Sequence, residues 1–144
     1  MPGRREPIRV LVVDDDATFV ALAREWLATE PSLTFVGWAR DGGEALETIA
    51  RLEPDVVLVG GVLPGLEGLE TARRIKAMPG APLVVVTSFA DSASVRREAW
   101  MAGADAFIAK TDLPEKLPAL LAEARIGQAP RPARPRAPRR DLRH

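Results

Sequence analysis

Short apolar runs alternate along the chain with longer segments in which apolar residues recur at helical spacing. Five runs of four to seven residues are rich in apolar and β-branched side chains: 8–13, 33–39, 56–59, 83–87 and 106–109. Such runs are typical of strands in a parallel sheet that is covered on both faces. After the first run, one stripe of a helix is formed by Phe19, Leu22, Ala23, Trp26 and Leu27. The alternation predicts an α/β fold with a doubly wound, five-stranded parallel sheet and helices on both faces.

Polar residues and glycines indicate the ends of the predicted helices. Asp16 and Asp91 stand where N-caps are expected for the first and fourth helices. Asp41 and Glu44 have the spacing of a capping box, in which two side chains satisfy unpaired backbone donors at a helix start. Gly103 follows the fourth helix and is a candidate for the left-handed residue that often ends a helix. Five strands and five helices in this succession favour the flavodoxin-like strand order 2-1-3-4-5.

The chain divides into three parts by composition and charge. Residues 1–7 form an N-terminal extension, residues 8–126 carry all the strand and helix patterns, and residues 127–144 are rich in Ala, Pro and Arg. Six of the 20 basic residues and one of the 20 acidic residues lie in this tail, so its net charge is +5 and that of residues 1–126 is −5. Because the tail has neither helical nor strand periodicity, we expect a disordered, solvated linker. The alternative is that it contacts nucleic acid through counterion release.

Deleting residues 127–144 is expected to leave the melting temperature nearly unchanged. The tail has few apolar residues to offset the conformational entropy lost on ordering, which is about 1–2 kcal/mol per residue. Thermal unfolding of the full and shortened chains, followed by circular dichroism, checks this. A drop of many degrees would show that the basic tail docks on the acidic body.

Several classes of protein are disfavoured. There is no cysteine, so neither disulfides nor thiolate metal sites contribute. The longest apolar runs have the length of strands, too short to cross a bilayer, and no signal peptide is evident after the charged N-terminus. We therefore expect a cytoplasmic protein that does not bind membranes. No helix-turn-helix fits into residues 127–144, so we expect no sequence-specific DNA binding by this chain.

Four polar side chains follow predicted strands at their carboxyl ends. Asp14 and Asp15 close the first strand, Thr87 closes the fourth, and Lys110 follows the fifth. In a doubly wound sheet these ends share the edge where ligands bind. Paired carboxylates beside a hydroxyl and an ammonium suit a hard cation such as Mg²⁺ next to a phosphoryl group. Taken alone, the acidic run is explained equally well as a strand exit followed by a helix cap.

These residues belong to a longer pattern that resembles the receiver domain of bacterial two-component response regulators. The resemblance covers residues 8 to about 126. It rests on Val-Val-Asp-Asp (12–15), Pro-Asp-Val-Val-Leu-Val (54–59), Pro-Gly-Leu-Glu-Gly-Leu (64–69), Val-Val-Thr-Ser (85–88) and Gly-Ala-Asp-Ala-Phe-Ile-Ala-Lys (103–110). Two further runs are most similar to receivers that precede LuxR-type DNA-binding domains: Glu-Pro-Ser-Leu (30–33) and Ala-Arg-Asp-Gly-Gly-Glu-Ala-Leu (39–46).

The resemblance implies a role for each residue at the strand ends. In the family an acidic pair binds Mg²⁺, a role that would fall on Asp14 and Asp15. A threonine and a lysine contact the phosphoryl group, here Thr87 and Lys110. An aromatic residue three positions before the lysine, here Phe107, is the family's rotamer switch. Mg²⁺, bound weakly at the acidic pair, is the one cofactor that the resemblance implies.

The chain departs from the family pattern at the end of the third strand. The position of the phosphorylated aspartate is occupied by Gly60, which has no side chain to attack a phosphodonor. Asp55 lies five residues earlier, about 16 Å away at the rise of a strand. Glu67, on the following loop, would reach the position only if the loop folded back. We therefore expect neither a phosphoacceptor nor a catalytic residue.

Two functional hypotheses follow. The leading one is a signalling module of two-component phosphorelay, not an enzyme, that acts by phosphorylation-independent contact with a protein. Its partner would be a histidine kinase, another receiver or an output domain, and a homodimer is an open alternative. The other hypothesis is an ordinary phosphorylatable receiver in mutated or fragment form, whose LuxR-type DNA-binding domain lies outside this chain.

In the family the lysine is shared between the acidic pair and the phosphoacceptor carboxylate. Because Gly60 removes that competing carboxylate, Lys110 is predicted to form a permanent ion pair with Asp14 or Asp15. An ammonium that faces two neighbouring carboxylates relieves their mutual repulsion. We expect a half-wet environment at the strand ends, in which the pair contributes about 1–2 kcal/mol.

Overall fold

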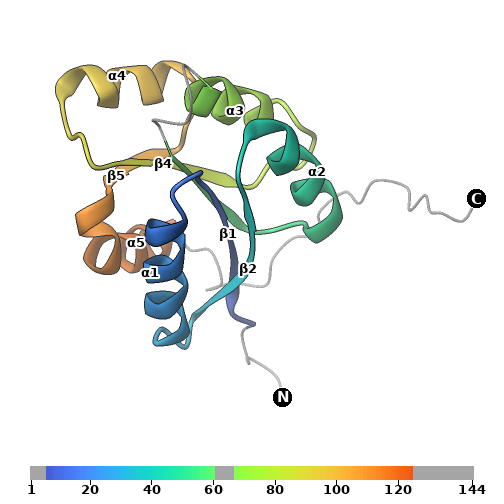
Figure 1. The fold of residues 1–144 in the computed structure, drawn as a ribbon, viewed down its shortest axis with the longest axis vertical. Helices are drawn as coiled ribbons and strands as arrows, with labels where there is room; N and C mark the ends of the chain where they lie inside the picture. Colours follow the sequence, from blue (N-terminus) through green and yellow to red (C-terminus); the bar gives the residue numbers. More distant parts are fainter. Residues whose placement is uncertain (1–5, 61–66, 125–144) are drawn as a thin grey trace, which may run out of the picture.

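The computed structural model describes residues 6–60 and 67–124 (Figure 1). The strands are β1 (Ile8–Val13), β2 (Leu33–Ala39), β3 (Val56–Gly60), β4 (Leu83–Ser88) and β5 (Ala106–Ala109). The helices are α1 (Ala17–Ala28), α2 (Gly42–Leu52), α3 (Glu67–Lys76), α4 (Ala93–Met101) and α5 (Leu113–Glu123), the last preceded by a 3-10 turn at Lys110–Asp112. The predicted tail at 127–144 and most of the predicted extension lie outside the described residues. No helix within the described ranges is long and apolar enough to cross a membrane.

All five strands are parallel, in the order β2-β1-β3-β4-β5, which confirms the predicted doubly wound sheet. Successive residues of a strand face opposite sides of the sheet. In β1, Val10 and Val12 therefore join one core cluster, and Leu11 and Val13 join the other. α1 and α5 cover the first face, and α2, α3 and α4 cover the second (Figure 1). The central strand β3 has no polar side chain along its whole length because both of its faces are buried.

The predicted helix ends are confirmed at three places. Asp16 caps α1 by accepting hydrogen bonds from backbone N–H groups of the first turn. At α2, Asp41 accepts from the Glu44 backbone N–H at 2.9 Å, and the Glu44 carboxylate accepts from the Arg40 N–H at 2.7 Å. Gly103 follows α4 with φ of 91°, the left-handed conformation that glycine adopts without steric strain.

The predicted cap of α4 was wrong. Ser92 caps this helix, with its hydroxyl oxygen accepting from the Val95 N–H at 3.2 Å. Asp91 instead accepts two hydrogen bonds from the guanidinium of Arg96, at 2.7 and 3.0 Å. These hydrogen bonds hold the pKa of Asp91 below its ordinary value. Asp91 thus forms a local ion pair with Arg96, and the next residue, Ser92, is the N-cap of α4.

The buried face of α1 is rotated relative to the predicted stripe. Phe19, Ala23 and Leu27 are buried as expected, but Leu22 is 59% exposed. Val20, which is not part of the stripe, is buried. The sheet decides which arc of the helix is covered, and here it covers the flank that carries Val20 and leaves the flank of Leu22 in solvent.

Candidate functional site

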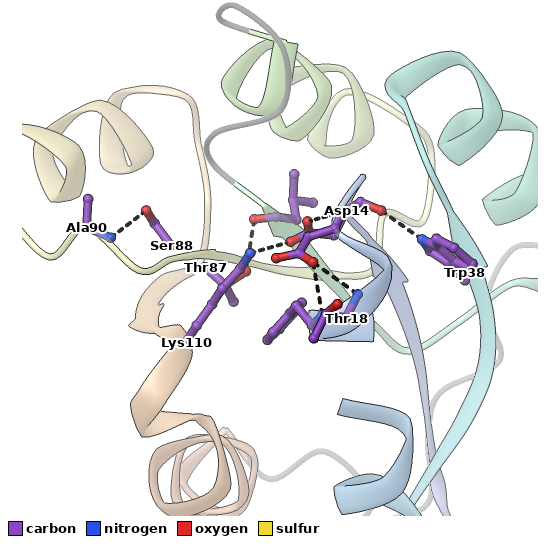
Figure 2. Close-up of polar contacts among 10 residues, drawn as sticks. Asp14, Thr18, Trp38, Thr87, Ser88, Ala90 and Lys110 are labelled. Atoms are coloured by element: carbon purple, nitrogen blue, oxygen red, sulfur yellow. Dashed lines mark hydrogen bonds and ion pairs between the residues drawn. The ribbon is translucent and has the colours of Figure 1, made fainter. Parts of the chain in front are cut away.

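The carboxyl ends of four strands bring the candidate residues together (Figure 2). Asp14 follows β1 and Lys110 follows β5. β3 and β4 each run one residue further than predicted, which places Gly60 opposite Thr87 in the parallel register. Asp14, Thr87 and Lys110 are buried, whereas Asp15 is exposed. We refer to Asp14, Gly60, Thr87 and Lys110 as the strand-end site.

Asp14 and Lys110 form a buried ion pair. The Lys110 Nζ lies 2.8 Å from Asp14 Oδ2, and the two side chains are only 2% and 3% exposed (Figure 2). The other oxygen, Oδ1, accepts a hydrogen bond from the Asp16 backbone N–H at 2.9 Å. Among the described residues, Oδ2 has no partner besides the ammonium. The predicted pair is confirmed with Asp14 as the partner, but the expected half-wet environment was wrong.

Two phenylalanine rings shield the ammonium from water. The Lys110 Nζ lies 4.2 Å from the ring centroid of Phe19 and 4.9 Å from that of Phe89. The two rings meet edge to face, with centroids 6.3 Å apart. An aromatic face attracts a cation, and the attraction grows when water is excluded. Sequence reasoning missed Phe89, although a large aromatic two residues after Thr87, among small and polar residues, was an available signal.

Gly60 leaves the space that the Asp14 carboxylate uses. A Cβ at residue 60 would lie 2.5 Å from Asp14 Oδ2 and 2.9 Å from its Cγ, closer than non-bonded atoms approach. Thr87, opposite Gly60, directs its hydroxyl toward the carbonyl oxygen of Val59 at 3.5 Å. A side chain at residue 60 would therefore require the Asp14 carboxylate to move from the position in which it pairs with Lys110.

Trp38 holds the backbone that carries Asp14. Its indole Nε1 donates to the Asp14 carbonyl oxygen at 2.7 Å (Figure 2), and the Arg40 guanidinium lies 5.4 Å from the ring centroid. This contact joins β2 to the end of β1. Because the chain has two other tryptophans, the fluorescence of Trp38 becomes a probe of the strand-end site in a variant with Trp26→Phe and Trp100→Phe.

Phe107 packs in the core layer beneath α2, α3 and α4. The Arg96 guanidinium lies 5.1 Å from its ring centroid and also pairs with Asp91. Phe107 is thus a packed core residue whose ring is in contact with the guanidinium of Arg96. The switch role that the resemblance implies for Phe107 stays a prediction.

The strand-end site does not fit Mg²⁺. Within residues 6–60 and 67–124, no three His, Cys, Asp or Glu side chains gather into a group that could hold a metal ion. The Asp14 carboxylate is engaged by the Lys110 ammonium, and Asp15 is exposed. Mg²⁺ demands near-ideal octahedral oxygen ligands and gives up its water reluctantly, so one exposed carboxylate is a poor ligand set.

Titration with Mg²⁺ is therefore expected to show no sub-millimolar binding. Calorimetry and tryptophan fluorescence measure the affinity. Lys110→Met frees the Asp14 carboxylate and should strengthen Mg²⁺ binding relative to wild type, because it removes a competing cation. Lys116→Met, which removes an exposed ammonium, is the matched control and should bind as the wild type does. Saturable sub-millimolar binding by the wild-type chain would contradict this expectation.

The fold and the strand-end site define a class of protein: a doubly wound α/β domain with a buried carboxylate, a hydroxyl and a lysine at the carboxyl edge of its sheet. The family model of the response regulator receiver domain matches residues 10–122. The chain therefore belongs to the response regulator receiver family of two-component signalling.

Related proteins carry this domain in different contexts. The protein-glutamate methylesterase/protein-glutamine glutaminase of Symbiobacterium thermophilum is 37% identical over 107 residues, which cover 74% of this chain and 30% of the relative. The chain thus spans about a third of the length of such relatives. The receiver domain of the putative response regulator NarL from Mycobacterium tuberculosis has a TM-score of 0.74 at 28% identity, covering 83% of this chain and 96% of that one. The response regulator domain of Thermotoga maritima CheB has a TM-score of 0.69 at 31% identity, covering 88% and 100%.

Proposed function

We propose that the chain is a degenerate receiver that signals through phosphorylation-independent contact with a protein partner. The observation that supports this most directly is the buried Asp14–Lys110 pair, which occupies the space beside Gly60. In this proposal Gly60 stands at the phosphoacceptor position. Thr87 and Phe107 are of the residue types that the family uses to contact the phosphoryl group and to switch rotamer. In this proposal no phosphoryl group forms to trigger them.

The chemistry of phosphoryl transfer supports the proposal. A receiver needs a nucleophile where the phosphodonor binds, and glycine supplies none. Asp55 lies at the opposite end of β3, where its carboxylate accepts from the Arg9 N–H at 2.9 Å. The side chain of Glu67, the other candidate acceptor, lies outside the described part of the chain. We accordingly assign no catalytic role to this chain.

A degenerate receiver that signals without phosphorylation requires a protein partner. A chain of the complex between the P1 domain of CheA3 and CheY6 from R. sphaeroides has a TM-score of 0.71 at 25% identity to this chain. By this likeness we propose a histidine kinase, another receiver or an output domain as the partner, with a homodimer as a further case. Because the ion pair is internal, the partner would recognise one standing conformation.

Incubation with acetyl phosphate is expected to leave the wild-type chain unmodified. A phosphate-affinity gel measures uptake, and a receiver with an intact acceptor aspartate is the positive control. Gly60→Asp is the matched variant, because it supplies the missing carboxyl. A shifted band in Gly60→Asp alone would show that the glycine removes the activity. A stoichiometric band in the wild-type chain, mapped to any carboxylate, would contradict the proposed function.

The second candidate is a receiver that works as part of a longer regulator. The observation that favours it is the short span of this chain relative to its curated relatives. A solved LuxR-family response regulator from Aurantimonas sp. SI85-9A1 is also similar, with a TM-score of 0.73 at 28% identity. Under this candidate the chain would regulate an attached output domain. Phosphate uptake by the wild-type chain would favour it over the degenerate receiver.

A further inference from the structure

β2 is an edge of the sheet with little protection against pairing with another strand. The sheet has two edges, β5 with four residues and β2 with seven (Figure 1). Native edge strands are commonly short, or carry charged side chains or proline, because their unpaired N–H and C=O groups attract further strands. β5 is short. β2 is the longest strand of the sheet, and its seven residues include no charged side chain and no proline.

The outer side of β2 is open among the described residues. Residues 34–38 are all half-buried or exposed, whereas every residue of β3 is buried. The backbone groups of 34–38 pair with β1, and within residues 6–60 and 67–124 no other segment hydrogen-bonds to them. A strand added at such an edge gains affinity from backbone hydrogen bonds.

A register shift makes the middle of β2 symmetrical. The pairing with β1 skips Val36, which is an extra residue on β2. Phe35 and Trp38 pair with two β1 residues of the same core cluster, so both lie on one face of the sheet. In a regular strand, residues three apart face opposite sides. Val36 and Gly37 lie on the other face. The order of faces is therefore the same when read from residue 35 to 38 as from 38 to 35.

We propose that two copies of this chain dimerise by pairing their β2 strands antiparallel, with a two-fold axis at the centre of β2. A two-fold axis perpendicular to a sheet relates identical strands in antiparallel orientation. Opposite residues of an antiparallel pair lie on the same face, which the symmetrical order of faces satisfies. Phe35 of one copy stands opposite Trp38 of the second copy, and Val36 stands opposite Gly37. The two aromatic pairs stabilise the contact.

A second copy is the occupant that this edge fits best. Identical strands bring like charges together wherever they carry them, and residues 33–39 carry none. The pairing also uses β2 as it stands, which agrees with recognition of one standing conformation. The inference deepens the proposed function and rests on it, since it names a second copy of the chain as the partner and β2 as the surface that binds it.

Analytical ultracentrifugation of the full chain should show a monomer–dimer equilibrium that depends on concentration. Val36→Lys places two ammonium groups side by side at the axis and should raise the dissociation constant by about tenfold or more. The stem of the lysine covers the apolar surface while its charge reaches water, so the fold is retained. Leu22→Lys on α1 and Trp100→Lys on α4 alter exposed apolar residues elsewhere and are the matched controls, which should dimerise as the wild type does.

Charge reversal separates a lost contact from a damaged fold. Val36→Glu should also fail to self-associate, because two carboxylates then meet at the axis. An equimolar mixture of Val36→Lys and Val36→Glu should restore the dimer, since opposite charges meet. Far-UV circular dichroism checks that both variants are folded. A mixture of folded variants that stays monomeric would overturn the proposal.

Oxidative cross-linking locates the axis without any charged variant. The chain has no cysteine, so Val36→Cys supplies a single thiol. At the axis, the two Cα atoms would lie within the roughly 4.4–6.8 Å that a disulfide spans. Oxidation at a concentration where the wild type dimerises should give a linked dimer, while Leu22→Cys should stay unlinked. No linked dimer from Val36→Cys would contradict the pairing.

Three association results would also overturn the proposal. One is a wild-type chain that stays monomeric up to about 1 mM. Another is a dimer that survives Val36→Lys and is lost in Leu22→Lys or Trp100→Lys, which would place the interface on a helix. The third is dimerisation only after deletion of residues 127–144, which would make the tail the occupant. Phosphate uptake by the wild-type chain would refute the proposed function and leave the association unchanged, so the two failures are distinguishable.

Discussion

Replacing Lys110 with alanine is expected to lower the free energy of unfolding by about 3–5 kcal/mol, the range for removing one partner of a buried ion pair. The Asp14 carboxylate would stay buried, with the Asp16 backbone N–H as its remaining hydrogen-bond donor among the described residues. The contacts of the ammonium with Phe19 and Phe89 would be lost as well. This effect exceeds the 1–2 kcal/mol expected for a half-wet site because both charges lie almost entirely out of solvent. Denaturant unfolding measures it.

Lys116 provides the matched control for this variant. Its Nζ lies 3.4 Å from Asp112 Oδ2 on an exposed helical turn, and Lys116→Ala should change stability by no more than about 0.5 kcal/mol. Adding Asp14→Asn to Lys110→Ala should recover part of the loss, because it removes the uncompensated charge. If Lys110→Ala is neutral, the ion pair does not stabilise the strand-end site, and the proposal that a partner recognises one standing conformation held by this pair is wrong.

The second large effect is expected from Gly60→Ala, which should lower the free energy of unfolding by about 2–3 kcal/mol, near the upper end for overpacking a core. The added Cβ would meet Asp14 Oδ2 at 2.5 Å, so the carboxylate must shift from the position in which it pairs with the Lys110 ammonium. Burial of both charges then loses its compensation. Chemical unfolding of the variant quantifies the loss. In a background with Trp26→Phe and Trp100→Phe, the fluorescence of Trp38, whose indole donates a hydrogen bond to the Asp14 carbonyl oxygen, reports the local shift.

Gly43→Ala is the control for the loss of a glycine. A Cβ at residue 43 would meet only Asp41 Oδ1, at 3.6 Å, so this variant should be neutral or up to about 1 kcal/mol more stable. The cycle with Asp14→Ala isolates the cause: Gly60→Ala should become nearly harmless once the carboxylate is gone. An equal loss in the presence and absence of the Asp14 carboxylate would show that another contact at residue 60 is responsible.

The fold and most of the site's composition could be predicted from local sequence because the signals are local. Residues that alternate across a strand, such as Val12 and Val13, join different core layers without knowledge of any distant residue. The Asp41–Glu44 capping box likewise depends on backbone groups within one turn. Topology then places the strand ends at one edge of the sheet. Since β3 and β4 separate β1 from β5, the approach of Lys110 to the acidic pair was predicted from the resemblance to receiver domains.

The sequence by itself determined the strand order and the residue types at the strand ends, whereas the tertiary structure decided which of them interact. Asp14 and not Asp15 binds the lysine because the chain turns out of the sheet at this point, leaving one carboxylate inside and the next in solvent. Phe89 joins the site through contacts with residues that are distant in sequence, and no periodicity in the β4–α4 connection encodes such contacts. The close fit between Gly60 and Asp14 is likewise a property of packed side chains, because a gap of a few ångströms is set by how β1 and β3 lie against each other and not by either segment alone.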